Sequence, residues 1–338
     1  MPGAGTRPNR TIPRARLGGS DVSVTRLVFG CAPLGGMYAA VGAEQARAAL
    51  QAAWDEGVRA FDTAPRYGAG LSERRLGAFL AERPGAEAVV STKVGFIPIG
   101  SDYEVGDEGG YYATPGPKLV PDFTGDGALR CVEASLERLG RDHIDVALIH
   151  DPVEHREAAL DGAYPVLHEL RAQGVVRAIG VGMVQADMLA WFVERADLDC
   201  VLVAGCYSLL GTPAAELLFP ACEDRGVAVL AAGVYKSGIL ADPRPGAQLD
   251  YEPAPTSVLE RVNRIRGVCE RYGVPLAAAA LQFVLAHPAV TAIVVGAATA
   301  REAHENAAHF RSAVPRELFD ELATAGLAAP LPHGAAQA

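Results

Sequence analysis

The sequence predicts a (β/α)8 TIM barrel, a closed sheet of eight parallel strands surrounded by helices. Short, almost wholly apolar runs alternate with amphipathic helical patterns along most of the 338 residues. Such runs are typical of parallel strands covered on both faces, and their alternation with helices indicates βαβ units. Eight units over roughly 300 residues fit one barrel domain.

A doubly wound open sheet is the competing prediction. A dinucleotide-binding sheet of that kind should carry G-x-G-x-x-G directly after a strand. The chain holds only partial matches, because GAG at 68–70 is followed by Glu73 and GVG at 180–182 by Gln185. The barrel is therefore preferred.

The expected elements follow in chain order. Strands are expected at 27–30, 60–63, 89–93, 146–150, 178–182, 201–204, 228–232 and 292–295. Helices are expected at 43–56, 72–81, 128–139, 158–173, 185–196, 214–225, 276–287 and 301–310. An extra helix is expected at 258–272, after a Gly/Pro-rich loop.

Besides the extra helix, two segments depart from a plain barrel. Residues 14–26 surround GGSD at 18–21 and predict an N-terminal β-hairpin over the N-terminal end of the barrel. Residues 94–127 are rich in Gly, Pro, Asp and Tyr without periodicity, and we expect a long loop at the C-terminal face. We predict a single domain over 14–325, with flexible tails at 1–13 and 326–338.

Composition narrows the function classes. The formal charge of −10 argues against a nucleic-acid partner, and no run is long and apolar enough to predict a membrane span. The start of the chain lacks the apolar core of a secretion signal. The six cysteines form no C-x-x-C and the histidines no H-E-x-x-H, so we expect free thiols, no metal and a cytoplasmic location.

Four polar residues at or just after expected strand ends carry the functional prediction: Asp62, Tyr67, Lys93 and His150. Catalytic groups of such barrels gather at the C-terminal strand ends. An ammonium beside a phenol favours the phenolate, a carboxylate holds the ammonium, and a neutral imidazole orients a substrate oxygen. This set suits proton transfer coupled to hydride transfer with a nicotinamide.

Each of the four also has a structural interpretation. A lone strand-end Lys or His is often structural, and a loop Tyr is often a surface aromatic. Four such residues at adjacent strand ends favour a site. Asp151, next to His150, is interpreted as a loop or capping residue.

The motifs around these residues resemble the aldo-keto reductase superfamily from about residue 16 to 310. The motifs are FDTAPRYG at 61–68, SERRLG at 72–77, TKVG at 92–95, SLERL at 135–139 and YSLL at 207–210. The resemblance implies that Tyr67 is the proton donor or acceptor, that Lys93 and Asp62 tune it, and that His150 orients the substrate.

A narrower resemblance is to the aldose 1-dehydrogenase branch, carried by GVGM at 180–183, AGCY at 204–207, SGIL at 237–240 and AALQF at 279–283. It implies NAD(P)-dependent oxidation of a cyclic hemiacetal to a lactone. It also implies cofactor contacts at Gly182, Met183, Ser237 and Gly238 and substrate contacts at Met37, Tyr38 and Cys206. The superfamily resemblance implies a nicotinamide stacked on Tyr207.

The chain departs from this branch at three positions. Val184 stands where the branch usually has Asn, Cys206 where it has Arg, and Lys236 where it often has Asn. Lys236 has two interpretations, a contact to the cofactor pyrophosphate or a solvated loop residue.

The segment after the last strand bears on the cofactor. NADP-preferring relatives place basic residues where Gly296 and Glu302 stand, and a carboxylate repels a 2′-phosphate or accepts from a ribose hydroxyl. We therefore expect NAD over NADP, unless Arg301 swings in, and we expect Asn306 to bind the adenine.

Several functions remain open. The leading hypothesis is oxidation of an aldose such as an L-fucose- or L-galactose-like sugar. The alternatives are a pyridoxal 4-dehydrogenase, a general aldehyde or ketone reductase, and a non-catalytic dinucleotide-binding regulatory subunit. Each implies a small-molecule ligand.

Overall fold

The structure is a computed structural model of the chain. It describes residues 11–37, 39–99, 118–250, 252–332 and 334, and the backbone alone of 104–105 and 114–115.

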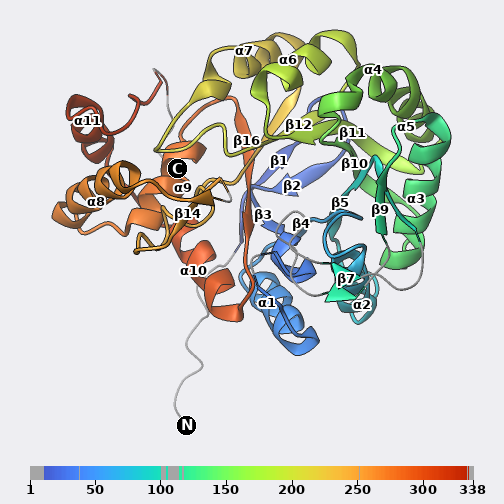
Figure 1. Ribbon diagram of the computed structural model, residues 1–338, viewed down its shortest axis with the longest axis horizontal. Helices are drawn as coiled ribbons and strands as arrows, with labels where there is room; N and C mark the ends of the chain where they lie inside the picture. Colours follow the sequence, from blue (N-terminus) through green and yellow to red (C-terminus); the bar gives the residue numbers. More distant parts are fainter. Residues whose placement is uncertain are drawn as a thin grey trace.

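Within the described residues, eight parallel strands close into a barrel, which confirms the predicted fold class (Figure 1). In chain order these strands are β3 (Leu27–Gly30), β4 (Ala60–Asp62), β5 (Val89–Val94), β10 (Ile144–His150), β11 (Val176–Met183), β12 (Cys200–Ala204), β13 (Ala228–Ala232) and β16 (Val290–Gly296). Each pairs in parallel with the next along the chain, and β16 closes the ring by pairing with β3.

Alternate residues of these strands fill the barrel interior, because side chains alternate between the two faces of a strand. A separate buried cluster contains Val28, Ala60, Leu148, Leu202 and Leu230, with their counterparts on the other strands. Positions two residues further along carry Asp62 after Ala60 and His150 after Leu148. The strand period therefore turns both side chains into the mouth of the barrel.

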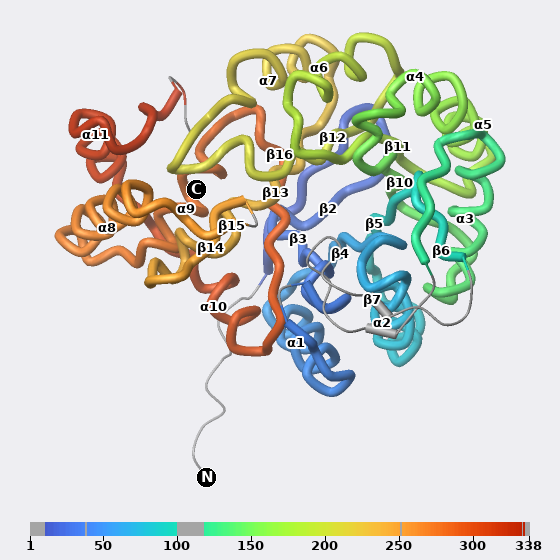
Figure 2. The backbone as a smooth tube through the Cα atoms, in the orientation of Figure 1, coloured from blue at the N-terminus to red at the C-terminus, as the bar shows by residue number. Residues whose placement is uncertain are grey.

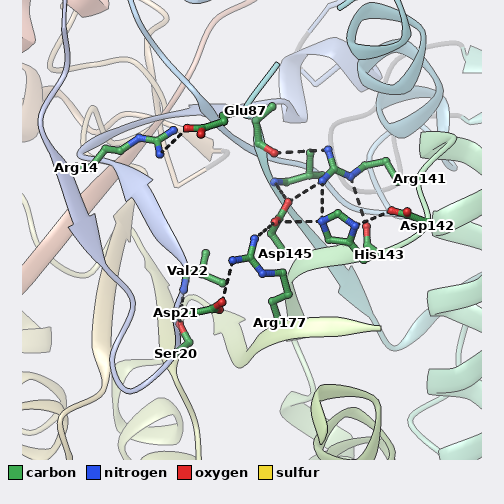
Figure 3. A network of polar contacts seen from close by, with 12 residues as sticks. Arg14, Ser20, Asp21, Val22, Glu87, Arg141, Asp142, His143, Asp145 and Arg177 are labelled. Carbon is green, nitrogen blue, oxygen red and sulfur yellow. Dashed lines mark hydrogen bonds and ion pairs between the residues drawn. The ribbon is translucent and has the colours of Figure 1, made fainter. Parts of the chain in front are cut away.

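The predicted N-terminal hairpin is present and covers the opposite end. β1 (Arg14–Arg16) pairs antiparallel with β2 (Ser23–Thr25), and Leu17, Val22 and Val24 join the interior cluster. Arg177 fastens the hairpin to the barrel by donating to Asp21 Oδ2 at 3.1 Å and to Asp145 Oδ1 at 2.9 Å (Figure 3).

Helices surround the barrel (Figure 2). They are α1 (Ala43–Asp55), α2 (Leu71–Ala81), α3 (Gly125–Leu139), α4 (Arg156–Ala158), α5 (Tyr164–Ala172), α6 (Ala186–Arg195), α7 (Leu218–Arg225), α8 (Thr256–Arg271), α9 (Leu276–Leu285), α10 (Ala300–Phe310) and α11 (Arg316–Thr324). Short 3-10 turns lie at Ala32–Gly35, Val153–His155 and Pro213–Ala215, and a π-helical turn at Ala159–Ala163 joins α4 to α5. The α9 helix is buried all round because α8 and α11 lie outside it.

The structure adds elements that the sequence did not predict. Within 94–127, β6 (Phe96–Ile99) pairs antiparallel with β9 (Lys118–Pro121), and β7 (Glu104–Val105) with β8 (Thr114–Pro115). A second small hairpin joins β14 (Gln248–Leu249) to β15 (Glu252–Pro253). Helix α11 was also not predicted. Ile12 and Leu327, which fall in the expected tails, are both buried in the main core.

No single described helix is long and apolar enough to cross a membrane, although α8 and α9, bent by 93° at their junction, reach that composition as a pair. Among the described residues, no group of three or more His, Cys, Asp or Glu side chains is placed to hold a metal ion.

Candidate active site

The Lys93 ammonium is the centre of the polar cluster at the mouth. Its Nζ donates to Asp62 Oδ2 at 2.8 Å, to the Thr63 carbonyl at 2.8 Å and to the Tyr67 hydroxyl at 3.0 Å. An ammonium has three donors, so all three are used. Ser91 donates to the other Asp62 oxygen at 3.0 Å. Lys93 and Asp62 are 1% and 3% exposed, so this is a buried and well-satisfied ion pair.

The turn after β4 brings Tyr67 to Lys93. The Tyr67 amide donates to the Ala64 carbonyl at 3.0 Å, which tightens the turn. Gly68, at φ +62°, packs directly on Gly35, and a Cβ on Gly35 would lie 2.5 Å from the Tyr67 carbonyl carbon. Glycine is therefore needed on both sides of this contact, because a larger residue would displace Tyr67.

Side chains of the SERRLG motif, at the start of α2, hold the same turn in place. Buried Glu73 accepts from Thr92 at 2.7 Å and from Arg138 Nε at 2.6 Å, which joins α2 to β5 and α3. Ser72 donates to the Cys31 carbonyl at 2.9 Å and bonds the Thr63 hydroxyl at 2.8 Å. These contacts fix the segment that carries Tyr67.

His150 lies against Tyr67, with the ring centroids 5.9 Å apart and the planes perpendicular. Burial holds the pKa of the His150 imidazole well below its usual range, and the charges of Lys93 and Arg66 lower it further. The imidazole is therefore neutral at neutral pH. The four residues predicted to meet at adjacent strand ends do lie together.

An ion pair beside His150 was missed in the prediction from the sequence. Asp151, interpreted there as a loop or capping residue, accepts from Arg66 Nη1 at 2.9 Å, and its Oδ2 lies 3.6 Å from His150 Nε2. Burial raises the pKa of the Asp151 carboxyl. Arg66 stands in the FDTAPRYG motif, but the pairing joins residues 85 positions apart and no sequence pattern announces it.

Of the expected substrate contacts, two are described. Met37 packs against buried Ala69, as do Tyr67 and Leu119. The Cys206 thiol donates to the Val184 carbonyl at 2.6 Å, and burial raises its pKa. Tyr38 lies outside the described residues.

Tyr207 is not open to a stacking partner in this conformation, contrary to the expectation. Its ring lies parallel to Phe283, with centroids 5.5 Å apart, and also contacts Phe219 and His287. Only 3% of the residue is exposed, since these side chains from α7 and α9 and the loop after α9 cover it. A nicotinamide would stack on it only after the ring moved.

The remaining expected cofactor contacts lie on separate strand ends and loops. Gly182 and buried Met183 end β11, and Gly182 pairs in register with His150. Ser237 and Gly238 follow Lys236 in a turn where all three residues have positive φ. Lys236 donates to both Asp250 oxygens, at 2.6 and 2.8 Å, so it is neither a free pyrophosphate contact nor simply solvated.

The start of α10 holds the residues expected at the adenosine. Glu302 Oε2 accepts from the Ala298 amide at 2.7 Å, and Asn306 Nδ2 donates to the Gly296 carbonyl at 3.2 Å. Arg301 pairs with Glu305 at 2.9 Å on the helix surface. The contacts of Glu302 and Asn306 fasten the loop after β16 to the helix that follows.

Comparison with known proteins gives consistent matches over most of the chain. The model of the aldo/keto reductase family matches residues 26–325. A D-threo-aldose 1-dehydrogenase from Pseudomonas sp is 40% identical over 328 residues, covering 94% of this chain and 98% of that protein. A pyridoxal 4-dehydrogenase from Microbacterium luteolum is 38% identical, covering 92% and 96%.

Solved structures show the same fold. The aldo-keto reductase AKR11C1 from Bacillus halodurans, in its holo form, superposes with a TM-score of 0.75 at 24% identity, covering 96% of this chain and 99% of that one. The glycerol dehydrogenase AKR11B4 from Gluconobacter oxydans gives a TM-score of 0.72 at 24% identity, covering 94% and 97%.

Proposed function

The chain belongs to the aldo/keto reductase family of oxidoreductases, and from that premise we propose that it oxidises the anomeric carbon of an aldose to a lactone with a nicotinamide cofactor. The observation that carries the proposal is the Lys93 ammonium 3.0 Å from the Tyr67 hydroxyl, beside a neutral His150. The similarity to an aldose 1-dehydrogenase at 40% identity supports the substrate class.

The proposed proton transfer uses groups of this chain. Lys93 stabilises the Tyr67 phenolate, which takes the proton of the anomeric hydroxyl as base. Neutral His150 donates a hydrogen bond to a substrate oxygen and so orients the reacting carbon. The C1–H bond breaks, a second C1–O bond forms, and the lactone carbonyl results. A bound nicotinamide supplies the acceptor for the hydride from C1.

The mouth has features that suit such a cofactor. Gln185 Oε1, just beyond β11, is buried without a hydrogen-bond partner among the described residues, and an amide group would satisfy it. A Cβ added to Gly238 would meet no described atom within 4 Å, so open space lies beside this residue of the 236–238 turn. Met183, Ser237, Gly238 and Asn306 are proposed to line the site. Tyr207 is proposed to do so only with its ring displaced.

We propose NAD rather than NADP. The Glu302 carboxylate lies at the start of α10, where it would repel a 2′-phosphate and accept from a ribose hydroxyl. Arg301 is engaged with Glu305 and lies on the outer surface of the helix. A ratio of kcat/KM for the two cofactors that favours NADP would contradict this preference.

Pyridoxal is the second substrate candidate, because the relative from Microbacterium luteolum is a pyridoxal 4-dehydrogenase at 38% identity. A general aldehyde or ketone reductase is a third. A binding-only regulatory role is disfavoured by the complete polar cluster around Lys93.

The test is a substrate panel followed at the nicotinamide absorbance. It contains aldoses of both C2 and C4 configurations, pyridoxal and simple aldehydes, each with NAD and NADP, and lactone products are identified by NMR. Oxidation of an aldose with the highest kcat/KM supports the proposal. Turnover of pyridoxal alone, or of aldehydes alone, selects the alternatives. Cofactor binding without turnover of any member indicates the regulatory role.

A further inference from the structure

An ion pair outside the four-residue cluster lies directly beside His150. Arg66 comes from the turn after β4 and Asp151 from the residue after β10. Arg66 Nη1 lies 2.9 Å from Asp151 Oδ2, and the same oxygen lies 3.6 Å from His150 Nε2. Their side chains are 34% and 28% exposed, so both are partly buried in the mouth.

Both members of the pair are held in place. Asp151 has a positive φ of 46°, which Asp tolerates better than most residues, and its amide donates to the Gly182 carbonyl at 2.9 Å. That bond continues the β10–β11 pairing one residue past His150. The Arg66 guanidinium lies 4.9 Å from the centre of the Phe96 ring, which in turn contacts the His150 ring at 6.0 Å. Arg66, Asp151, His150 and Phe96 thus form a closed ring of contacts.

The Asp151 carboxylate and the cations near His150 have opposite effects on the charge state of the imidazole. A bare carboxylate at 3.6 Å would favour the imidazolium, because an opposite charge stabilises the charged form of its neighbour. Among the described residues, the titratable groups that face His150 are Lys93 from β5, Tyr67 and Arg66 from the turn after β4, and Asp151. Arg66 and Lys93 both lower the pKa of His150 and both oppose the burial that raises the pKa of Asp151. Arg66 pairs with Asp151 and also lowers the pKa of His150, so it opposes the effect that a bare carboxylate would have on the imidazole.

We propose that Arg66 and Asp151 are a positioning pair for His150. Arg66 holds the Asp151 carboxylate 3.6 Å from Nε2, beyond hydrogen-bond reach, and offsets its charge, so that the imidazole stays neutral and its single N–H remains available to a substrate oxygen. The expected effect of this pair on turnover rests on the proposed function. The effect on the charge of His150 is measured without turnover.

The experiment compares four variants by two readouts. The variants are Arg66→Gln, Arg66→Lys, Asp151→Asn and the double variant Arg66→Gln/Asp151→Asn. The first readout is the NMR titration of the His150 imidazole between about pH 4 and 8, assigned with His150→Gln. The second is the acid limb of kcat/KM for the best substrate of the panel.

Arg66→Gln should raise the pKa of His150 by about 1 unit or more, since it frees a carboxylate to act on the imidazole. Arg66→Lys should keep it near the wild-type value, because a cation is retained. The double variant should also return it toward that value, since the carboxylate is gone. Asp151→Asn alone should not raise the pKa of His150. It should lower kcat several-fold, because it weakens the contacts among Arg66, His150 and Phe96.

Two results would overturn the proposal. One is an unchanged His150 titration in Arg66→Gln. The other is a rise in the pKa of His150 in the double variant that equals the rise in Arg66→Gln, since Asp151 would then not be its cause. If Arg66→Gln does not fold, a titration in Arg66→Lys that differs from wild type by as much as 1 unit also contradicts it. Failure of the proposed function is distinguishable, because the titrations would behave as expected while no aldose was oxidised.

Discussion

The two ends of the barrel each bury a carboxylate among cations, but they use it differently. At the mouth, Asp62 holds Lys93, and the third donor of Lys93 goes to the hydroxyl of Tyr67. At the opposite end, Asp145 accepts from the Val90 amide at 2.9 Å, from Arg141 at 3.0 Å and from Arg177 at 2.9 Å (Figure 3).

The difference lies in where each network ends. The groups around Asp145 are tied to the backbone and to the N-terminal hairpin, and Asp145 itself is 2% exposed. The network at the mouth ends on a phenol, which exchanges a proton far more readily than an arginine. We therefore expect the base of the barrel to govern stability and the mouth to govern turnover, as in barrels of this fold generally.

The largest expected effect comes from Lys93→Met. This variant leaves the Asp62 carboxylate buried without its cation and should lower the free energy of unfolding by about 3–5 kcal/mol. It should also lower kcat by about 100-fold or more, because the phenolate loses its cation. Urea unfolding and steady-state kinetics measure the two effects. Adding Asp62→Asn should recover much of the stability and none of the turnover; recovered turnover would contradict this role for Lys93.

Asp145→Ala tests the other end. It should also cost about 3–5 kcal/mol of stability, since Arg141, Arg177 and the Val90 amide lose a buried acceptor. Arg177→Gln is the milder control and should cost about 1 kcal/mol or less, because the arginine is one-third exposed. Both variants should keep the kcat of wild type per folded molecule at 25 °C. A large fall in kcat with stability intact would show that the two ends are not separate.

A smaller effect is expected in the dependence of stability on pH. His150 has a lowered pKa in the folded state, so below about pH 6.5 the unfolded state binds the extra proton and the folded state does not. Stability should therefore fall as pH decreases from about 6.5 toward the folded-state pKa, by at most about 1.4 kcal/mol per pH unit for this group. In His150→Gln, the free energy of unfolding measured with urea should change less steeply with pH. An unchanged dependence on pH would contradict the lowered pKa of His150.

Much of the fold could be predicted because each barrel strand is a short apolar run between helical patterns. The four polar residues could be predicted because strand ends of a parallel barrel converge. The β6–β9 hairpin was missed because Pro98 and Pro121 interrupt the strand pattern. Helix α11 was missed because it has only two to three turns, with Leu318, Phe319 and Leu322 as its buried face.

The rest of the site depends on side-chain placement that one sequence does not reveal. The pairing of Arg66 with Asp151 needs a positive φ at a non-glycine residue and a contact across two loops. The covered ring of Tyr207 depends on how α7 and α9 pack, although its motif suggested an exposed face. Lys236 left two interpretations open, and its partner, Asp250, lies on the β14–β15 hairpin.

The role of Tyr67 in proton transfer is tested by the single-turnover rate of nicotinamide reduction in Tyr67→Phe against wild type, with the best substrate of the panel. Removing the hydroxyl leaves the ring contacts with His150 in place, so folding and cofactor affinity should stay near wild type. The rate of Tyr67→Phe is expected to be at least about 100-fold lower at saturating cofactor and substrate. A rate within a few-fold of wild type, with cofactor bound, would contradict the assignment of Tyr67 as the proton-transfer group.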